Sequence, residues 1–395
     1  MSRSKRTWLR RILLALLGLL VVGMVGFFTL APGIVENSRN VVEKTDLPEP
    51  DAETLALHES LFIADMHADT LLWKRNLLES SSRGQVDLPR LQKGNVGLQV
   101  FSSVSKTPKG QNYDSNPADT DNITLLTFAQ LQPPRTWTSL LQRSLYHAEK
   151  LQKAVDDSDG ELRFIKTRGD LAALITDRAA GKNVTGALFS LEGLQNLEGD
   201  AANLEVLFDA GARMAGFTHF FDNEVAGSMH GEEKGGLTDL GRKVFAEMEE
   251  RGMVVDIAHA SHPAIAEMLE LATQPVVASH GGVQATCDVN RNLTDAEIRG
   301  VAKTGGVIGI GYWDAAVCEL TPAAVVDAIE HVIKIGGVET AALGSDFDGA
   351  VTTAWDTSQI AVITQELRDR GHSDTDIAAI MGGNTARVLS YVLPD

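Results

Sequence analysis

Ionisable side chains follow short apolar runs at several places in this chain of 395 residues. The run that begins "LFIADM" at residue 61 ends in His67 and Asp69, one residue apart. Such side chains also close five later runs: Glu192, His219, His259, His280 and Asp346. In a strand, side chains two residues apart share a face, so His67 and Asp69 can reach one point. Any one of these residues alone is more often structural, but the repeated pattern indicates a site.

The residue types predict a metal centre. His67, His259 and His280 offer imidazoles, and Asp69 and Glu192 offer carboxylates. Nitrogen and oxygen ligands without thiolate suit zinc or a similar divalent ion. Five ligands exceed the three of one catalytic zinc, but they suit two ions that share a bridging carboxylate. Such a pair holds a bridging hydroxide and polarises a carbonyl, so we expect hydrolysis of an amide or ester.

Three further residues have predicted roles beside the metal ligands. Asp346 is expected to take a proton from the attacking water and deliver it to the leaving amine, as general base and then general acid. His219 is expected to hydrogen-bond the oxyanion. Arg291, in a loop after the sixth run, would bind a substrate carboxylate, and a surface salt bridge is an equally good interpretation from the residues alone.

The apolar runs alternate with amphipathic helical patterns. The eight runs cover residues 61–69, 96–104, 185–193, 213–223, 252–261, 274–282, 305–313 and 341–349. Buried strands that alternate with helices indicate a parallel sheet. Eight such units favour a (β/α)8 TIM-like barrel, in which the carboxyl ends of the strands meet at one mouth. An open doubly wound sheet is the alternative, but no glycine-rich phosphate loop follows the first run.

Composition restricts the partners. Lys and Arg total 35 and Asp and Glu total 53, so the net charge is −18, which disfavours nucleic-acid binding. The two cysteines, Cys287 and Cys318, imply neither a disulfide framework nor a zinc ribbon.

The N-terminus predicts a membrane segment. Residues 1–11 carry five basic side chains, and residues 12–31 carry no charge over about 30 Å of helix, the thickness of a bilayer core. We expect a basic cytoplasmic segment at 1–11 and a transmembrane signal anchor at 12–31, with a cleaved signal peptide as the alternative. A polar linker is expected at 32–55, and the catalytic domain at 56–395 would lie in the periplasm or outside the cell.

The ordered motifs "DMHADT", "SLEG", "THFFDNEVAGS", "VVASHGG", "RNLTDAEI" and "GSDFDG" resemble those of the membrane dipeptidase family of zinc peptidases. The resemblance covers about residues 55–393. It implies a metal-dependent hydrolase barrel with two zinc ions. His67, Asp69 and Glu192 would bind one ion, Glu192, His259 and His280 would bind the other, and Glu192 would bridge the two. It also implies substrate contacts at His219 and Arg291 and acid–base chemistry at Asp346.

The expected function is that of a membrane-anchored zinc dipeptidase that uses a metal-bridging hydroxide and accepts dipeptides, including those with a C-terminal D-residue. The domain would carry a helical insertion at about 105–184. The expected partners are the dipeptide, the membrane and, as an alternative to a monomer, a second copy in a homodimer. Two other hypotheses are another metal-dependent amidohydrolase, such as an N-acyl amino-acid deacylase or lactonase, and a binding protein on an inactive scaffold.

Overall fold

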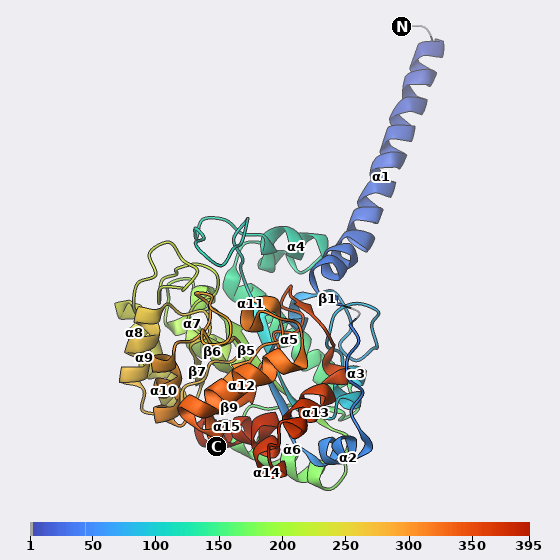
Figure 1. Ribbon diagram of the computed structural model, residues 1–395. Coiled ribbons are helices and arrows are strands. Elements are labelled where there is room, and N and C mark those ends of the chain that lie inside the picture. Colours follow the sequence, from blue (N-terminus) through green and yellow to red (C-terminus); the bar gives the residue numbers. More distant parts are fainter. Residues whose placement is uncertain (1–2, 44) are drawn as a thin grey trace.

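The computed structural model describes residues 3–43 and 45–395, in which helices and strands alternate along most of the chain (Figure 1). The strands are β1 (Val41–Val42), β2 (Ile63–Ala68), β3 (Val96–Val104), β4 (Leu162–Phe164), β5 (Thr185–Glu192), β6 (Ala212–Gly216), β7 (Val254–Asp256), β8 (Ile308–Ile310), β9 (Ala341–Leu343) and β10 (Thr352–Thr353).

The α-helices lie mainly outside the sheet and vary widely in length. They are α1 (Arg3–Arg39), α2 (Ala52–Ser60), α3 (Leu88–Lys93), α4 (Ile123–Ala129), α5 (Leu140–Asp157), α6 (Arg168–Ala179), α7 (Ala202–Asp209), α8 (Asp239–Arg251), α9 (His262–Leu271), α10 (Asp295–Thr304), α11 (Asp314–Val317), α12 (Pro322–Gly336), α13 (Ala361–Asp369), α14 (Asp374–Ala378) and α15 (Asn384–Val392).

The main sheet is parallel and curled, so the fold is α/β. Its strands follow the order β7-β6-β5-β3-β2-β9-β8, and β4 pairs separately with the start of β5. Every residue of β2, β3 and β5 is buried, as in a parallel sheet covered on both faces. The predicted strand-and-helix alternation is therefore confirmed.

The two ends of this strand order, β7 and β8, both contact the sixth predicted run. Asp256 of β7 forms an isolated parallel bridge with Val277, and Ala278 forms another with Ile308 of β8. This run is extended but makes only isolated bridges, so it is shorter as a strand than the sequence predicted.

The amino ends of the strands are closed by the C-terminal helix. Val388 and Leu389 of α15 meet apolar side chains from the strands, among them Met66, Val100 and Met214. Asn384 lies inside this helix, where its amide nitrogen donates to the carbonyl oxygens of Val338 and Ala341 at 2.8 and 2.9 Å. The α15 helix therefore covers the amino ends of the strands, and the carboxyl ends are left for a site.

The long connection from β3 to β5 is attached to the sheet through buried polar side chains. On α5, His147 Nδ1 lies 2.8 Å from Ser103 Oγ of β3, and Ser144 Oγ lies 3.1 Å from the same oxygen. Asn196 Nδ2 also donates to Ser144 Oγ at 3.0 Å. This segment, which the sequence predicted as a helical insertion at about 105–184, holds α4, α5, β4 and α6.

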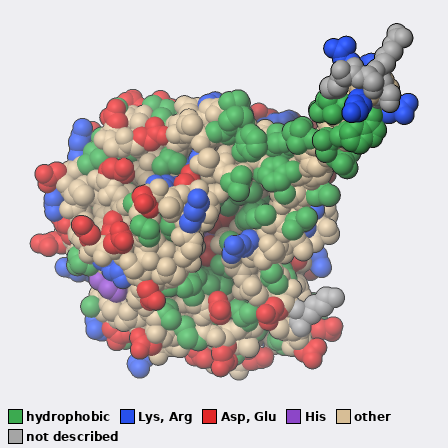
Figure 2. All heavy atoms as spheres, turned by 90° about the horizontal axis from the view of Figure 1, so that it is seen from above, with side chains coloured by type: hydrophobic (Ala, Val, Ile, Leu, Met, Phe, Trp, Pro, Cys, Tyr) green, Lys and Arg blue, Asp and Glu red, His purple; other side chains and the backbone are tan. Residues whose placement is uncertain are grey.

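Helix α1 projects from the body of the molecule and exposes its apolar side chains (Figures 1 and 2). Its Lys5–Arg39 portion contains an 18-residue window with a mean hydropathy of 2.6 and is long and apolar enough to cross a membrane, although a signal sequence has the same properties. The predicted linker at 32–55 needs correction, because α1 continues through Pro32 to Arg39 and Val41–Val42 then pairs with Thr352–Thr353.

The end of α1 is fixed to the domain by ionic contacts. Glu36 is 1% exposed, and its carboxylate lies 2.5 Å from Arg75 Nε and 3.3 Å from Arg83 Nε. Arg75 in turn pairs with the buried Asp348. The segment that follows the apolar helix is therefore part of the folded domain.

The prediction about the two cysteines also needs correction. Cys287 and Cys318 form a disulfide, with their Cα atoms 5.4 Å apart, although nothing in their spacing predicts that they pair. They lie in the loops after the sixth run and after β8, which come together only in the folded chain. The bond joins the loop that carries Arg291 to the loop that carries Trp313.

The acid sensitivity of the fold should depend partly on His147. Burial, with Lys150 and Arg143 nearby, lowers the pKa of His147 to about 3. The unfolded chain binds a proton near pH 6.5 and the folded chain does not, so stability is lost as pH falls from about 6.5 toward 3. Replacing His147 with Gln should reduce the loss of stability between pH 7 and 4.5 by an amount on the order of 2 kcal/mol. Thermal unfolding at the two pH values measures this difference.

His262 provides the matched control with the opposite sign. Its hydrogen bond with Glu297, at 2.6 Å, raises its pKa, so its contribution is present at low pH and is lost as pH rises through the raised pKa. His262→Gln should therefore lose stability mainly at pH 4.5. Equal pH dependence of wild type and His147→Gln would contradict the role given to His147.

Candidate metal centre

The predicted site residues all lie at the carboxyl ends of the strands. His67 is within β2 and Asp69 follows it, while Glu192 is the last residue of β5. The remaining members stand in the loops after β6, β7, the 276–279 segment and β9: His219, His259, His280, Arg291 and Asp346. Each of these eight side chains belongs to a residue that is at most 7% exposed. The fold thus gathers residues that are up to 279 positions apart in the chain.

Glu192 Oε1 is the centre of the cluster. His259 Nε2 lies 3.1 Å from this oxygen, and His67 Nε2, His219 Nε2 and His280 Nε2 each lie 3.5 Å from it. His67 Nε2 also lies 3.5 Å from Asp69 Oδ1 and 3.9 Å from Asp346 Oδ1. Four imidazoles and three carboxylates therefore meet within a few ångströms.

Three overlapping sets of side chains have the spacing to hold a metal ion. In each set the ligand atoms lie within 4.8 Å of one another: His67, Glu192 and His280; Glu192, His219 and His259; His67, Asp69 and Asp346. Glu192 and His67 each belong to two sets. This grouping differs from the division that the resemblance implies, because His67 is paired with His280 and because His219 and Asp346 also have ligand spacing.

The donor set fits a metal. Several of its buried atoms have no hydrogen-bond partner within the described residues: His67 Nε2, Asp69 Oδ1, Glu192 Oε2 and His259 Nδ1. In addition, His259 Nε2 and His280 Nε2 face each other at 3.0 Å. Unpaired buried polar atoms are costly, and two imidazole lone pairs repel unless a cation or proton lies between them. Divalent cations bound by His67 Nε2, by the carboxylate oxygens and by the facing Nε2 atoms of His259 and His280 would remove most of these costs.

Electrostatics also favour a cation here. Burial, together with the Asp69 and Asp346 carboxylates, raises the pKa of Glu192 well above its ordinary value. Burial opposes a charge on His67, but the Glu192 and Asp69 carboxylates outweigh it and raise the pKa of His67 to about 10. Burial lowers the pKa of His280 well below its usual value, so its imidazole is neutral and can act as a ligand. An added cation would therefore stabilise the ionised carboxylates of this site.

A second layer of polar side chains orients His280. Ser279 Oγ donates to Asp256 Oδ2 at 2.5 Å and lies 2.8 Å from His280 Nδ1. Because the Ser279 hydroxyl donates its hydrogen bond to Asp256, Nδ1 of His280 must be the donor to Ser279 Oγ. The lone pair of His280 is then on Nε2, which faces Glu192. Hydrogen bonds of this kind fix the tautomer of a metal-binding histidine.

Asp346 is held in an uncommon backbone conformation. Its φ is 59°, and Asp348 and Ala350 in the same loop have φ values of 63° and 61°. Non-glycine residues in this region cost energy and are concentrated at functional sites. A Cβ on Gly349 would lie 2.1 Å from Asp346 Oδ1, so the carboxylate requires glycine there. Burial, with the nearby Asp69 carboxylate, raises the pKa of Asp346 to about 7 although His67 opposes the shift.

Arg291 is a buried cation without an anionic partner. Its guanidinium carbon lies 4.6 Å from the Trp313 ring centroid, and Nη1 donates to the His280 carbonyl oxygen at 3.3 Å. Nη2 has no hydrogen-bond partner within the described residues, and Arg291 is absent from the ion pairs found there. Gly281 leaves space for the side chain, since a Cβ there would lie 2.8 Å from Nη1. A buried guanidinium of this kind is suited to an anionic ligand.

His219 lies between the cluster and the loop after β3. Burial lowers its pKa to about 3, so the ring is neutral. Its Nδ1 is 3.4 Å from the Lys106 carbonyl oxygen, which can only accept a hydrogen bond. This contact favours a proton on Nδ1 and leaves the lone pair of Nε2 directed at Glu192.

The sequence missed several side chains that cover the site. Tyr113 reaches over it from the loop after β3, and its hydroxyl lies 3.2 Å from Trp313 Nε1. The Tyr113 carbonyl oxygen accepts from Asn290 Nδ2 at 2.6 Å and lies 2.9 Å from His230 Nδ1. His230 stacks on Phe220 at 4.6 Å. No local pattern in the sequence pointed to Tyr113.

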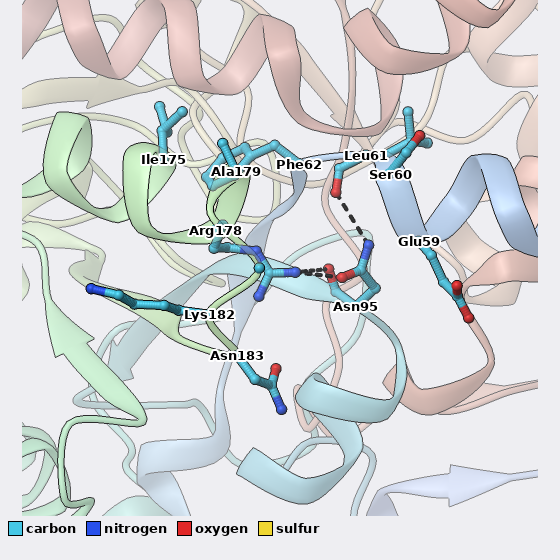
Figure 3. Close-up of a pocket in the computed structure, with 11 residues that line it drawn as sticks. Glu59, Ser60, Leu61, Phe62, Asn95, Ile175, Arg178, Ala179, Lys182 and Asn183 are labelled. Carbon is cyan, nitrogen blue, oxygen red and sulfur yellow. Dashed lines mark hydrogen bonds between the residues drawn. The ribbon is translucent and has the colours of Figure 1, made fainter.

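A surface cavity of about 280 Å³ lies at the opposite ends of the strands (Figure 3). It is lined by residues that precede β2, β3 and β5, such as Phe62, Asn95 and Asn183. Arg178 there donates to the carbonyl oxygen of Asn95 at 3.0 Å, and Asn95 donates to that of Leu61 at 3.2 Å. Arg178 and Asn95 thus bond to neighbouring backbone, and the chemistry of such folds occurs at the other end of the strands.

A profile of the membrane dipeptidase family, peptidase family M19, matches residues 51–393. The chain belongs to the membrane dipeptidase family. This confirms the predicted family and the enzyme class, that of a metal-dependent dipeptidase. A dipeptidase, AclJ of Aspergillus oryzae, is 30% identical over 352 residues, covering 84% of this chain and 78% of the relative. An uncharacterised dipeptidase of Schizosaccharomyces pombe is 27% identical, covering 86% and 83%.

Solved structures share the fold of this dipeptidase. The probable dipeptidase PvdM of Pseudomonas aeruginosa aligns with a TM-score of 0.72 at 21% identity, covering 86% of this chain and 98% of that one. A metallopeptidase of Rhodobacter sphaeroides, bound to a phosphinate mimic of the dipeptide L-Ala-D-Ala, aligns with a TM-score of 0.71 at 19% identity, covering 84% and 99%. At this identity the likeness shows the α/β fold with its curled parallel sheet.

The central position of Glu192 predicts the metal content of variants. We expect the dipeptidase to bind about two zinc ions per chain, and Glu192→Gln to bind fewer than one, because the charge shared by two of the ligand sets is lost. Elemental analysis of the purified full chain after dialysis measures this. Glu297→Gln is the control, since it also removes a buried carboxylate but keeps the side-chain acceptor for Thr294. Unchanged metal content in Glu192→Gln would contradict its place as the shared ligand.

Proposed function

We propose that this chain is a membrane-anchored binuclear zinc dipeptidase that hydrolyses dipeptides, including those with a C-terminal D-residue. The observation that carries the proposal is the buried, unpaired Arg291 beside a cluster of metal-binding side chains. A guanidinium next to a hydrolytic metal centre suits a substrate whose free carboxylate lies one residue beyond the scissile bond. That arrangement describes a dipeptide.

The proposed ligands are His67, Asp69 and Glu192 for one ion, and Glu192, His259 and His280 for the other. When bound, the two ions would activate water and polarise the scissile carbonyl. The mixture of imidazole and carboxylate donors without thiolate supports zinc. The paired imidazole nitrogens of His259 and His280, 3.0 Å apart, support a shared cation on their side of Glu192.

Asp346 and His219 would act on protons and charge. The Asp346 carboxylate would take a proton from the attacking water and deliver it to the leaving amine nitrogen. Its pKa, raised to about 7 mainly by burial, suits both acceptance and donation near neutral pH. His219 would stabilise the oxyanion by donating from Nε2, which requires its proton to leave the long 3.4 Å contact with Lys106.

The surroundings support a short substrate. Tyr113 and Trp313 meet above Arg291, and Asn290 and His230 hold the Tyr113 backbone in place. A substrate anchored by its carboxylate at Arg291 would therefore have little room to extend past its second residue. The related Rhodobacter sphaeroides enzyme is described with a mimic of L-Ala-D-Ala, which supports a D-residue at the second position.

The N-terminus supports an anchored enzyme outside the cytoplasm. Basic residues precede the 12–31 run, which favours retention of that end in the cytoplasm and translocation of the remainder. The Cys287–Cys318 disulfide suits an oxidising compartment. We therefore propose a catalytic domain in the periplasm or at the cell exterior, with α1 as its anchor.

We also propose a closed barrel and a homodimer. The isolated bridges of residues 277 and 278 to β7 and β8 support a closed (β/α)8 barrel with eight members. A homodimer also remains a prediction, although all the residues in the proposed site come from one chain.

A substrate panel tests the function. The full chain in detergent, loaded with zinc, should cleave L/L and L/D dipeptides, and a chelator should abolish the activity because the ligand atoms lose their ions. Release of free amino acids measures it. Tripeptides, N-acyl amino acids and lactones complete the panel. A zinc-loaded protein that cleaves no dipeptide would overturn the proposal, and faster turnover of N-acyl amino acids or lactones would favour the other amidohydrolase class.

Asp346→Asn tests the acid–base role. Loss of the proton acceptor should lower kcat for a good dipeptide by about 100-fold or more, with zinc content unchanged. The comparison of kcat and metal content is necessary because Asp346 also has ligand spacing. Asp314→Asn, at an exposed carboxylate of α11 near the same mouth, is the control and should keep full activity. A fall in zinc content in Asp346→Asn would assign Asp346 to the metal instead.

A further inference from the structure

Helix α4 exposes a row of large apolar side chains beside the base of α1. Leu125 is 65% exposed, Phe128 is 40% exposed, and Leu131, just after the helix, is 58% exposed. Viewed from above, hydrophobic side chains run from α1 onto the adjoining face of the domain (Figure 2). We call Leu125, Phe128 and Leu131 the α4 patch. Contiguous exposed apolar side chains usually mark a contact surface.

The other side of α4 is already packed. Ile123 and Leu126 pack against Leu72, Trp73 and Val104, at the carboxyl ends of β2 and β3. Gln130 Nε2 also donates to the Leu72 carbonyl oxygen at 2.9 Å, which fixes the end of the helix. The α4 patch therefore cannot turn inward. A helix that is apolar on both sides needs a second apolar environment.

The position of the patch along α1 identifies that environment. The rings of Phe28 and Phe128 meet with their centroids 5.4 Å apart. Phe28 belongs to the uncharged run of residues 12–31, four positions before Pro32. At 1.5 Å per residue, Phe28 lies only about 5 Å from the outer end of that run. If the 12–31 run crosses a bilayer, Phe128, which touches Phe28, must lie at the outer boundary of that bilayer.

The surrounding residues suit a lipid interface. Phe128 also contacts Trp137, with ring centroids 5.3 Å apart, and Trp137 Nε1 donates to the Gln132 carbonyl oxygen. Tryptophan with a satisfied indole N–H is typical of the boundary between acyl chains and head groups. The net charge of −18 excludes attraction to anionic lipids as the main force, so apolar burial would carry the contact.

We propose that the α4 patch inserts into the outer boundary of the phospholipid bilayer and forms a second membrane contact next to α1. This inference rests on the proposed membrane anchor. Because residues 105–137 carry both Tyr113 and the α4 patch, the contact would hold the covered mouth of the site close to the membrane surface.

Lipid quenching of single labelled sites tests the proposal in the full chain. An NBD fluorophore is attached to one introduced cysteine in each of three variants: Leu125→Cys, Leu271→Cys and Leu20→Cys. The native cysteines do not react with the label because they are joined in a disulfide. Each variant is reconstituted into phosphatidylcholine vesicles with or without doxyl-labelled lipid. Leu271 of α9 is the matched control, at 42% exposed and outside the patch, and Leu20 reports on α1. Label at 125 should be blue-shifted and quenched about twofold, as expected for shallow insertion, and label at 271 should not change.

The three sites separate the outcomes. Quenching at 20 but not at 125 would overturn the second contact and leave the anchor in place. Lack of quenching at both 20 and 125 would overturn the anchor itself. A blue shift at 125 without quenching by doxyl lipid would show that protein, such as a second copy of the chain, covers the patch, and would also overturn the proposal.

Discussion

The buried carboxylate of Glu192 is the constraint on which the site depends. Four imidazole nitrogens lie within 3.5 Å of its Oε1 atom, and two further carboxylates are close by. A desolvated group of this kind is stable only when cations or hydrogen bonds compensate it. The parallel sheet provides the geometry, because it brings the carboxyl ends of distant strands together. Divalent ions would supply the charge that the protein itself lacks.

The layer beneath the ligands explains why the imidazoles have fixed directions. The Asp256 carboxylate accepts a hydrogen bond from the Ser279 hydroxyl, whose oxygen in turn accepts one from His280 Nδ1. Asp65 plays a related part, because its carboxylate accepts from the backbone of His67 at 3.0 Å and of Ser345 at 3.2 Å. These carboxylates are fully buried, and burial raises the pKa of each. Their unfavourable desolvation is offset by hydrogen bonds that orient the metal-binding residues.

The local sequence pattern was sufficient to predict much of the fold and the residues that gather at the site. Each apolar run that was expected as a strand is extended, and residues such as His67 and Asp346 follow directly because strand ends determine where they lie. What was missed depends on contacts between distant segments. The Cys287–Cys318 bond, the pairing of Val41–Val42 with Thr352–Thr353 and the reach of Tyr113 over Trp313 have no signal within their own segments. The ligand spacing of His219 and Asp346 also arises only when distant segments meet.

Helix α1 and the loop that carries Asp346, the proposed acid–base residue, are linked through one ion network. Glu36, at the end of α1, pairs with Arg75, and Arg75 pairs with Asp348, two residues from Asp346. Asp348 also accepts from Thr70 Oγ1 at 2.7 Å, and its carbonyl oxygen accepts from Trp73 Nε1 at 2.7 Å. Because these partners are buried, loss of Glu36 would leave Arg75 with one of its two carboxylate partners, Asp348, in the Asp346 loop. Cleavage near residue 31 would retain Glu36, so an anchored and a released enzyme would both keep this support.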